Sequence, residues 1–249
     1  MTTSPGTATN LITELVIANR ILAREDVVDA YGHVSVRNPE APERFFLAHS
    51  KSPALIEAAD IVEHTLDGQA LKKEARPLYL ERFIHAAIYE ARPDVIAVVH
   101  AHAEDVLPFT ITRAALKPVI HSGAFIGAEV PVWDIAERFG DRTNLLVTNM
   151  DQGRDLAKTL GDRNVALMRG HGFAAAARSL IDVVRMSVYL PRNARVQQKA
   201  MQLGELKPLS RGEIDARAAG PGYKPQSPET QRAWQYWAGR ASCGELLKD

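Results

Sequence analysis

The sequence is poor in three features, and each shortage excludes a class of protein. It has one cysteine, Cys243, in 249 residues, so no disulfide can form within the chain and a reducing, cytoplasmic location is expected. Basic and acidic residues number 30 each, and this balance predicts neither a nucleic acid nor a membrane surface as partner. No apolar run is long enough for a membrane span or a signal peptide, because Glu14, Asn19 and Arg20 interrupt the N-terminal one. A small-molecule partner is expected instead.

The most informative stretch present is residues 94–104, DVIAVVHAHAE. Its β-branched apolar run predicts a strand that is buried on both faces. Side chains alternate between the faces of a strand, so His100 and His102, which follow the run, point the same way. Two imidazoles that converge at the end of a buried strand suit a divalent metal ion. The stretch therefore predicts a metal site.

A third histidine strengthens this prediction. His171 lies between Gly170 and Gly172, in the run 169–172 that directly follows the apolar segment 164–168, which also predicts a buried strand. An H-x-H pair alone is weak evidence for a metal, and a lone histidine between glycines is more often a turn residue. Three histidines at strand ends favour metal binding over those structural roles.

The remaining pattern predicts an α+β fold with a largely antiparallel sheet. Helical spacing predicts helices over 10–24, 78–91 (opened by Pro77), 151–160 and 179–204, the last kinked at Pro191. Strands are predicted over 29–37, 44–49, 60–65, 95–99, 118–121, 129–132, 145–147 and 165–168. The first two strands flank a proline-containing turn and are expected to pair antiparallel.

The composition also predicts how the chain is divided. Residues 1–8 are rich in Thr, Ser, Pro and Gly, which predicts a disordered start. Residues 9–205 are predicted to form one metal-binding domain. Residues 206–249 are predicted to be an extension, in which the aromatics between Trp234 and Trp237 require burial on the domain or on a neighbouring subunit.

Several motifs occur in a recognisable order over residues 10–205. They are Gly32–Arg37, Asp60 with Asp67–Gly68, Glu81 with His85, Arg92–His102, Gly127 with Val130–Val132, and Gly170–Gly172. In this order they resemble the class II aldolase/adducin-like family. The resemblance implies a three-layer α/β/α domain on a mostly antiparallel central sheet, assembled as a homotetramer with active sites between subunits. It also implies His100, His102 and His171 as metal ligands, with Glu81 as the acid/base residue beside the metal.

The departures from the family pattern concern the substrate. Sugar-phosphate members carry Gly-Asn where this chain has Gly32–His33, a Thr-Pro-x-Gly-like loop where it has Ser50–Pro53, and Ser-Ser where it has Tyr79–Leu80. A phosphate requires small hydroxyls and glycine amides, most of which are missing here. The chain therefore resembles the decarboxylase branch, which includes 3-hydroxy-2-methylpyridine-4,5-dicarboxylate decarboxylase and dihydroxyphthalate decarboxylase.

The resulting hypothesis is a carboxy-lyase of aromatic compound catabolism. It decarboxylates a hydroxylated aromatic or pyridine carboxylic acid through an enolate-like carbanion that a divalent ion, Mn²⁺ or Zn²⁺, stabilises. Glu81 is the expected proton donor to carbon. The residues expected to bind the substrate are His33, Ser50, Lys51, Ser52 and Tyr79.

Three alternatives compete with this hypothesis. An aldolase or epimerase acting on a sugar or hydroxy acid would use the same metal. A non-catalytic scaffold of the adducin type is disfavoured, because adducin heads lack the ligand set that this chain keeps. A cupin-like oxygenase is suggested by the sequence from His100 to Glu104, but its spacing is short and the predicted helices do not suit a small β-barrel.

Overall fold

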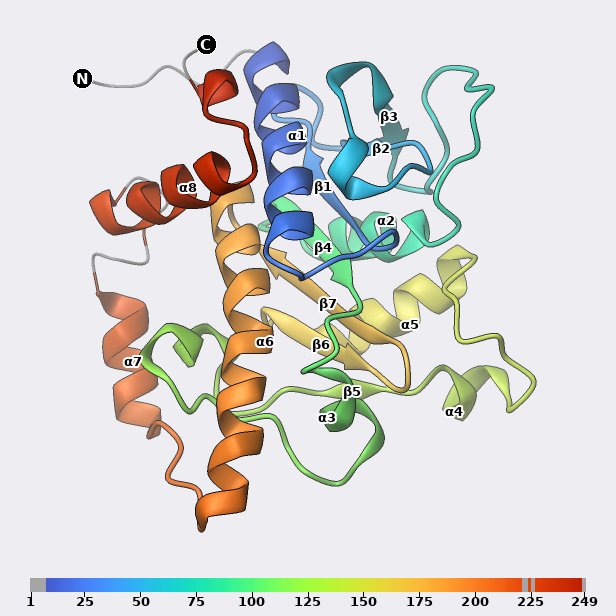
Figure 1. Cartoon of the computed structure of the whole chain (residues 1–249). Helices are drawn as coiled ribbons and strands as arrows, with labels where there is room; N and C mark the ends of the chain where they lie inside the picture. The colour runs from blue at the N-terminus through green and yellow to red at the C-terminus, as the bar shows by residue number, and fades with distance from the viewer. Residues whose placement is uncertain (1–7, 221–223, 225–226, 248–249) are drawn as a thin grey trace.

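A computed structural model of the chain describes residues 8–220, 224 and 227–247 (Figure 1). At its centre is a seven-stranded sheet with the strand order β3-β2-β1-β4-β7-β6-β5. The strands are β1 (His33–Arg37), β2 (Arg44–Ala48), β3 (Ile61–Thr65), β4 (Ala97–Ala101), β5 (Val132–Trp133), β6 (Val165–Met168) and β7 (Gly172–Ala177). All neighbours pair antiparallel except the edge strand β5, which is parallel to β6. The predicted mostly antiparallel central sheet is confirmed.

Helices cover both faces of this sheet, which makes three layers (Figure 1). One face packs against α1 (Ala8–Arg24) and α6 (Leu180–Leu203), and the other against α2 (Arg82–Ala91) and α5 (Met150–Leu160). The remaining helices are α3 (Leu107–Ile111), α4 (Ile135–Phe139), α7 (Arg211–Ala219) and α8 (Pro228–Arg240), with the 3₁₀ turns η1 (Pro53–Leu55), η2 (Ala58–Asp60), η3 (His121–Ile126) and η5 (Glu245–Leu247).

The alternation of side chains along β4 divides the core between these layers. Val99 belongs to the apolar cluster on the α1 and α6 side, and Val98 belongs to the cluster on the α2 and α5 side. Both side chains are fully buried, as expected for a central strand covered on both faces. His100 has the parity of Val98, so it lies on the α2 side of the sheet.

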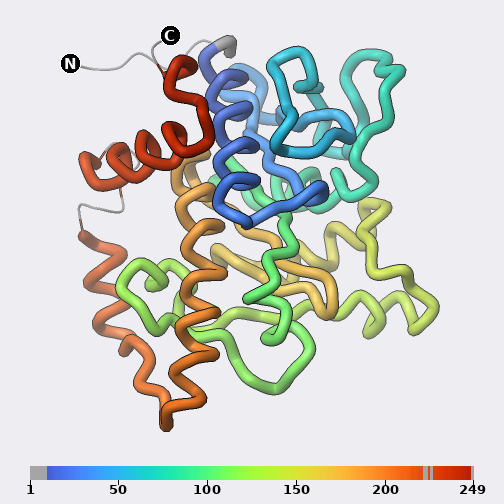
Figure 2. The backbone as a smooth tube through the Cα atoms, viewed as in Figure 1, coloured from blue at the N-terminus to red at the C-terminus, as the bar shows by residue number. Residues whose placement is uncertain are grey.

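The long helices follow the sequence pattern closely. The helix predicted over 179–204 is α6, whose N-cap Ser179 accepts a hydrogen bond from the Asp182 amide at 3.1 Å. This helix contains Pro191, and Figure 2 shows it as one continuous helix. The kink expected at Pro191 stays a prediction. The helix predicted over 78–91 is α2, but the predicted start was wrong, because the helix begins at Arg82. Leu78 forms a β-bridge with His49, just after the end of β2, so the chain there is extended and not helical.

Two predicted strands are wrong because side chains, and not a neighbouring strand, satisfy their backbone groups. In the segment 118–121, the Val119 and Ile120 amides donate to Asn193 Oδ1 of α6, at 2.9 and 3.3 Å. The segment 145–147 is a loop in which Leu145 has a left-handed φ of 65° and the Val147 amide donates to a carboxylate. Sequence pattern alone does not reveal such partners.

Two further differences concern the edge and the centre of the sheet. The strand predicted over 129–132 is displaced, since β5 covers only Val132 and Trp133; the Pro131 carbonyl before it accepts from the Leu167 amide at 2.9 Å. The central strand β7, GFAAAA, was not predicted, because alanine has a low strand propensity. Its small residues pair with β4 on one side and β6 on the other.

The ends of the chain bear on the predicted divisions. Residues 1–7, most of the predicted disordered start, lie outside the described residues. Near the other end, Trp234 and Trp237 of α8 are buried in the cluster formed with α1 and α6. The predicted boundaries of the domain, between residues 8 and 9 and between residues 205 and 206, stay predictions. Among the described residues, no helix has the length and apolarity needed to cross a membrane.

Candidate active site

His100 and His102 lie at the end of β4 and project from the same face of the sheet. His100 is fully buried, and its Nδ1 lies 3.0 Å from the Phe173 carbonyl of the neighbouring strand β7. Because a carbonyl only accepts hydrogen bonds, Nδ1 of this imidazole carries a proton, so Nε2 is the atom that can offer a lone pair to a cation. Burial, with the nearby His100 and His171 rings, lowers the pKa of His102 to about 3. Both histidines are therefore suited to bind a cation.

His171 reaches the same point from the hairpin that joins β6 to β7. Gly170 before it has a φ of 63°, a conformation that glycine adopts without strain. The Gly172 Cα lies so close to β4 that an added Cβ would be 2.2 Å from the Ala101 carbonyl oxygen. The flanking glycines thus form a tight turn packed against β4, which brings the His171 ring to 5.0 Å from that of His102.

Glu81 approaches from the opposite side, at the residue before α2. Its Oε1 accepts a hydrogen bond from the Val147 amide at 3.1 Å, and its Oε2 lies 3.3 Å from His100 Nε2 and 3.4 Å from His171 Nε2. Burial opposes ionisation of this carboxyl, but the two imidazoles outweigh burial and hold its pKa well below the usual range. Glu81 is therefore a carboxylate at rest, and it receives a proton before it can give one.

These four side chains have the geometry of a metal site. The Nε2 of His102 lies 3.0 Å from that of His100 and 3.2 Å from that of His171, and the carboxylate distances are similar. A tetrahedral ion with ligands at about 2.0–2.1 Å places its ligand atoms about 3.3 Å apart. Within the described part of the chain, Glu81, His100, His102 and His171 form the group that could hold a metal ion. The residues fit the predicted cofactor, and three imidazoles do not select between Mn²⁺ and Zn²⁺.

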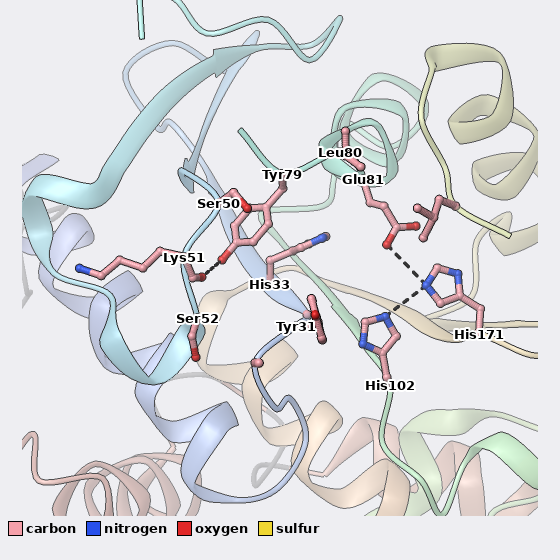
Figure 3. A pocket seen from close by; sticks show the side chains of 13 residues that line it. Tyr31, His33, Ser50, Lys51, Ser52, Tyr79, Leu80, Glu81, His102 and His171 are labelled. Atoms are coloured by element: carbon pink, nitrogen blue, oxygen red, sulfur yellow. Dashed lines mark hydrogen bonds and ion pairs between the residues drawn. The ribbon is translucent and has the colours of Figure 1, made fainter. Parts of the chain in front are cut away.

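The cluster opens into a cavity of about 500 Å³ (Figure 3). The cavity is lined by Ala30, Tyr31, Gly32, His33, Ser50, Lys51, Ser52, Tyr79, Leu80, Glu81, His102, Leu146 and His171. Every predicted site residue except His100 is in this lining, and His100 lies behind it in the sheet. Segments far apart in sequence thus meet at one pocket, although the roles predicted for the individual residues stay predictions.

The predicted substrate-binding residues differ in what they offer to a ligand. The side chain of Lys51 points away from the cavity (Figure 3), and its Nζ pairs with the Asp60 carboxylate at 2.6 Å. The hydroxyl of Tyr79 donates to the Lys51 carbonyl, which ties this loop to the wall of the cavity. The hydroxyls of Ser50 and Ser52 make no hydrogen bond within the described residues, so they remain available to a ligand. Lys51 is therefore better placed to hold the loop than to contact a substrate carboxylate.

Other lining residues were missed by the sequence pattern. Leu80 and Tyr31 lie at the rim and are 61% and 72% exposed. Leu146 lies on the loop 145–147, where the amide of the next residue, Val147, donates to Glu81. They come from loops, where periodicity carries no information. Glu104, the third residue of the cupin-like pattern, is exposed and does not belong to the cluster of described metal ligands. A sheet covered by helices on both faces likewise excludes the cupin alternative.

Comparison with known proteins adds independent information. The family model of the class II aldolase and adducin N-terminal domain matches residues 13–198. The decarboxylase tropJ of Talaromyces stipitatus is 36% identical over 244 residues, which cover 91% of this chain and 92% of that protein. The 3,4-dihydroxyphthalate decarboxylase of Arthrobacter keyseri is 29% identical over 259 residues, which cover 97% and 98% of the two chains.

Solved structures show the same fold. An aldolase II superfamily protein from Pseudomonas syringae superposes with a TM-score of 0.78 at 21% identity, covering 98% of this chain and 96% of the other. The L-fuculose 1-phosphate aldolase from Glaciozyma antarctica gives a TM-score of 0.71 at 24% identity, covering 98% and 94%. At these identities the likeness concerns the fold alone.

Proposed function

Because the chain belongs to the class II aldolase and adducin N-terminal domain family, and to the branch of it that includes decarboxylases, we propose that it is a metal-dependent carboxy-lyase. Its substrate is a hydroxylated aromatic or heteroaromatic carboxylic acid. The observation that carries the proposal is that the cluster of three histidines and Glu81 opens into a cavity whose other walls are largely aromatic and aliphatic. His100, His102 and His171 hold the divalent ion.

The cavity favours a flat ring over a phosphosugar. Tyr31, Tyr79, Leu80 and Leu146 give it apolar walls, which cover the faces and edges of an aromatic ring. The hydroxyls of Ser50 and Ser52 at one side can donate to a carboxylate. The dense set of hydroxyls and amides that a phosphate requires is not present among the described residues of this lining.

The reaction breaks the bond between a ring carbon and its carboxylate, and a proton replaces the departing CO₂. When bound, the divalent ion supplies a Lewis acid that stabilises the electron pair left behind. The Glu81 carboxylate takes up a proton from solvent on Oε2 and delivers it to the ring carbon that CO₂ has left. The Val147 amide donates to Glu81 Oε1, and the other oxygen lies 3.3 Å from His100 Nε2 and 3.4 Å from His171 Nε2, beside the proposed ion.

The assembly and location implied by the resemblance stay predictions. A homotetramer with active sites between subunits would place a neighbour beside the exposed rim residues Tyr31 and Leu80. A cytoplasmic location is supported by the single cysteine, Cys243.

The test is CO₂ release by the purified, manganese-supplied protein from a panel of hydroxylated benzene and pyridine carboxylates. We expect release that a chelator abolishes and that added metal restores. Liberation of an aldehyde from a sugar or hydroxy acid, without CO₂ release from the panel, would instead identify an aldolase. Protein that binds no metal would point to an adducin-type scaffold.

A further inference from the structure

A chain of buried polar groups runs from the cavity into the layer between the sheet and α2. His33 Nδ1 lies 2.6 Å from His85 Nε2, and His85 Nδ1 lies 2.6 Å from Ser35 Oγ. Ser35 Oγ lies 2.8 Å from the Tyr89 hydroxyl, which donates to the Ile96 carbonyl at 3.4 Å. The metal site and the proposed mechanism use neither His85, Ser35 nor Tyr89.

The sequence places these groups in register. His33 and Ser35 are two residues apart on β1 and share a face, and His85 and Tyr89 are one turn apart on α2. All four are buried: Ser35 and His85 are 0% exposed, Tyr89 is 1% exposed, and His33, which reaches the cavity, is 4% exposed. Buried polar groups are costly unless they are paired, so this arrangement must contribute something that apolar residues would not.

Both histidines of the chain are neutral. A buried imidazolium is costly unless an anion pairs with it, and among the described residues the ring nitrogens of His33 and His85 have only each other and the Ser35 hydroxyl as hydrogen-bond partners. A neutral imidazole has one N–H and one lone pair. Each hydrogen bond of the chain therefore contains one proton. All of these hydrogen bonds must donate in the same direction, either from His33 toward Tyr89 or the reverse.

The inner end sets that direction. The Ile96 carbonyl can only accept, so Tyr89 donates to it and accepts from Ser35. Ser35 then accepts from His85 Nδ1–H, and His85 Nε2 accepts from His33 Nδ1–H. A reversed chain would give up the bond to Ile96 and would point an N–H of His33 toward the cavity that holds the cation site. The forward direction leaves a lone pair on His33 Nε2.

We propose that His85, Ser35 and Tyr89 are positioning residues that hold His33 in its Nδ1–H tautomer, so that Nε2 accepts a hydrogen bond from a hydroxyl of the ligand. This inference rests on the proposed function in taking the ligand to be a hydroxylated acid. It makes the substrate-binding role predicted for His33 specific, because a lone pair on Nε2 accepts from a hydroxyl and cannot donate to a carboxylate. His33 would thus select ring acids that carry a hydroxyl.

The chain sets the tautomer of His33 and does not carry a proton away. Its inner end is the backbone carbonyl of Ile96, directly before β4, which also accepts from the Arg37 amide at 2.7 Å and has no proton to pass on. Moving a positive charge along it would place an imidazolium at the fully buried His85. Fixing the direction of neutral hydrogen bonds is what this geometry allows.

The first test is the tautomer of His33 in zinc-loaded protein, which is diamagnetic, measured by ¹⁵N NMR of labelled histidines. We expect a pyrrole-type signal for His33 Nδ1 and a pyridine-type signal for Nε2. Ser35→Ala removes the acceptor of His85 Nδ1–H, and Tyr89→Phe removes the acceptor of Ser35. We expect the chain to reverse in both variants and the two signals of His33 to exchange types. A pyrrole-type Nε2 in the unaltered protein would overturn the proposal.

The second test is ligand preference, measured by calorimetric titration of the same zinc-loaded proteins with 2-hydroxybenzoate and with benzoate. We expect the ratio of the two affinities to fall about fivefold in Ser35→Ala and Tyr89→Phe, the effect of one neutral hydrogen bond. The matched controls are Ser187→Ala, a buried serine of α6, and Tyr236→Phe, an exposed tyrosine of α8. The controls should leave both the ratio and the His33 signals unchanged.

Two variants and two readouts keep the outcomes separate. Unchanged tautomer and unchanged ratio in both variants would exclude a positioning role. If one variant fails to fold, the other and the unaltered protein still decide the question. The proposed decarboxylation fails separately, by absence of CO₂ release, and neither the NMR signals nor the affinity ratio depend on turnover.

Discussion

The Nε2 atoms of His100 and His102 lie 3.0 Å apart, and that of His171 lies 3.2 Å from His102. The Phe173 carbonyl accepts a hydrogen bond from Nδ1 of His100. The Nε2 atom of His100 is therefore the one that can offer a lone pair to a cation. His102 Nε2 carries either one proton or one lone pair, so it can form a hydrogen bond with only one of its two imidazole neighbours. A cation at the centre of the cluster satisfies all three imidazoles at once.

We therefore expect His100→Ala and His171→Ala each to weaken metal binding by more than about 100-fold, above the cost of losing an outer-shell partner. His121→Ala, which changes an exposed histidine of η3, should bind metal as the unaltered protein does. Metal content after dialysis and competition with a chromophoric chelator measure the effect. Unchanged stoichiometry in both ligand variants would contradict the assignment.

For Glu81→Gln we expect near-normal metal content but a loss of turnover of roughly 10²–10⁴-fold. The amide keeps the size of the side chain and can still accept from Val147, but it cannot take up a proton. Glu104→Gln, a change at an exposed residue, is the matched control and should alter neither property. Steady-state kinetics with a saturating substrate measure the effect, and full activity in Glu81→Gln would remove this residue from the mechanism.

The pH dependence of stability should report on Asp60. Although burial opposes ionisation of this carboxyl, hydrogen bonds from Lys51, the Glu57 amide and His49 lower its pKa from 3.8 to about 2. A lowered pKa stabilises the folded state above pH 3.8, and that contribution is lost as the pH falls toward 2. We expect Asp60→Asn to lower the free energy of unfolding at pH 7 by about 1–2 kcal/mol and to have a smaller effect near pH 3.

Urea denaturation at the two pH values measures this difference. Asp141→Asn, a change at an exposed aspartate, should leave the unfolding midpoint unchanged at both. An equal loss of stability for Asp60→Asn at pH 7 and at low pH would show that the carboxylate charge is not what stabilises the loop.

The adjacent residues Tyr236 and Trp237 allow a matched test of how α8 is held. Trp237 is 2% exposed and its ring packs against Tyr189 of α6 at 5.9 Å, whereas Tyr236 is 58% exposed. We expect Trp237→Ala to cost about 3–5 kcal/mol of unfolding free energy and Tyr236→Ala less than about 0.5 kcal/mol. Thermal unfolding of both variants measures this; similar losses would mean that α8 is not anchored through Trp237.

The sequence determined the parts of the site that depend on local period. Alternation along β4 brings His100 and His102 to one face, and the glycines around His171 form the tight turn that brings its ring to them. The helices α1, α5 and α6 followed from the helical spacing of their apolar residues. These features depend on residues within a few positions of one another, and for that reason the sequence alone predicts them.

Only the tertiary structure decided which groups far apart in the sequence form hydrogen bonds with one another. The segment 145–147 has the composition of a strand but forms a loop, because the Val147 amide holds Glu81. The alanines of β7 form a strand because β4 and β6 pair with them on both sides. The direction of the chain behind His33 likewise depends on Ile96, a partner that no local pattern indicates. Hydrogen bonds across long sequence separations are set by packing, and the packing of this sheet against α2 brings His33, Ser35, His85 and Tyr89 together.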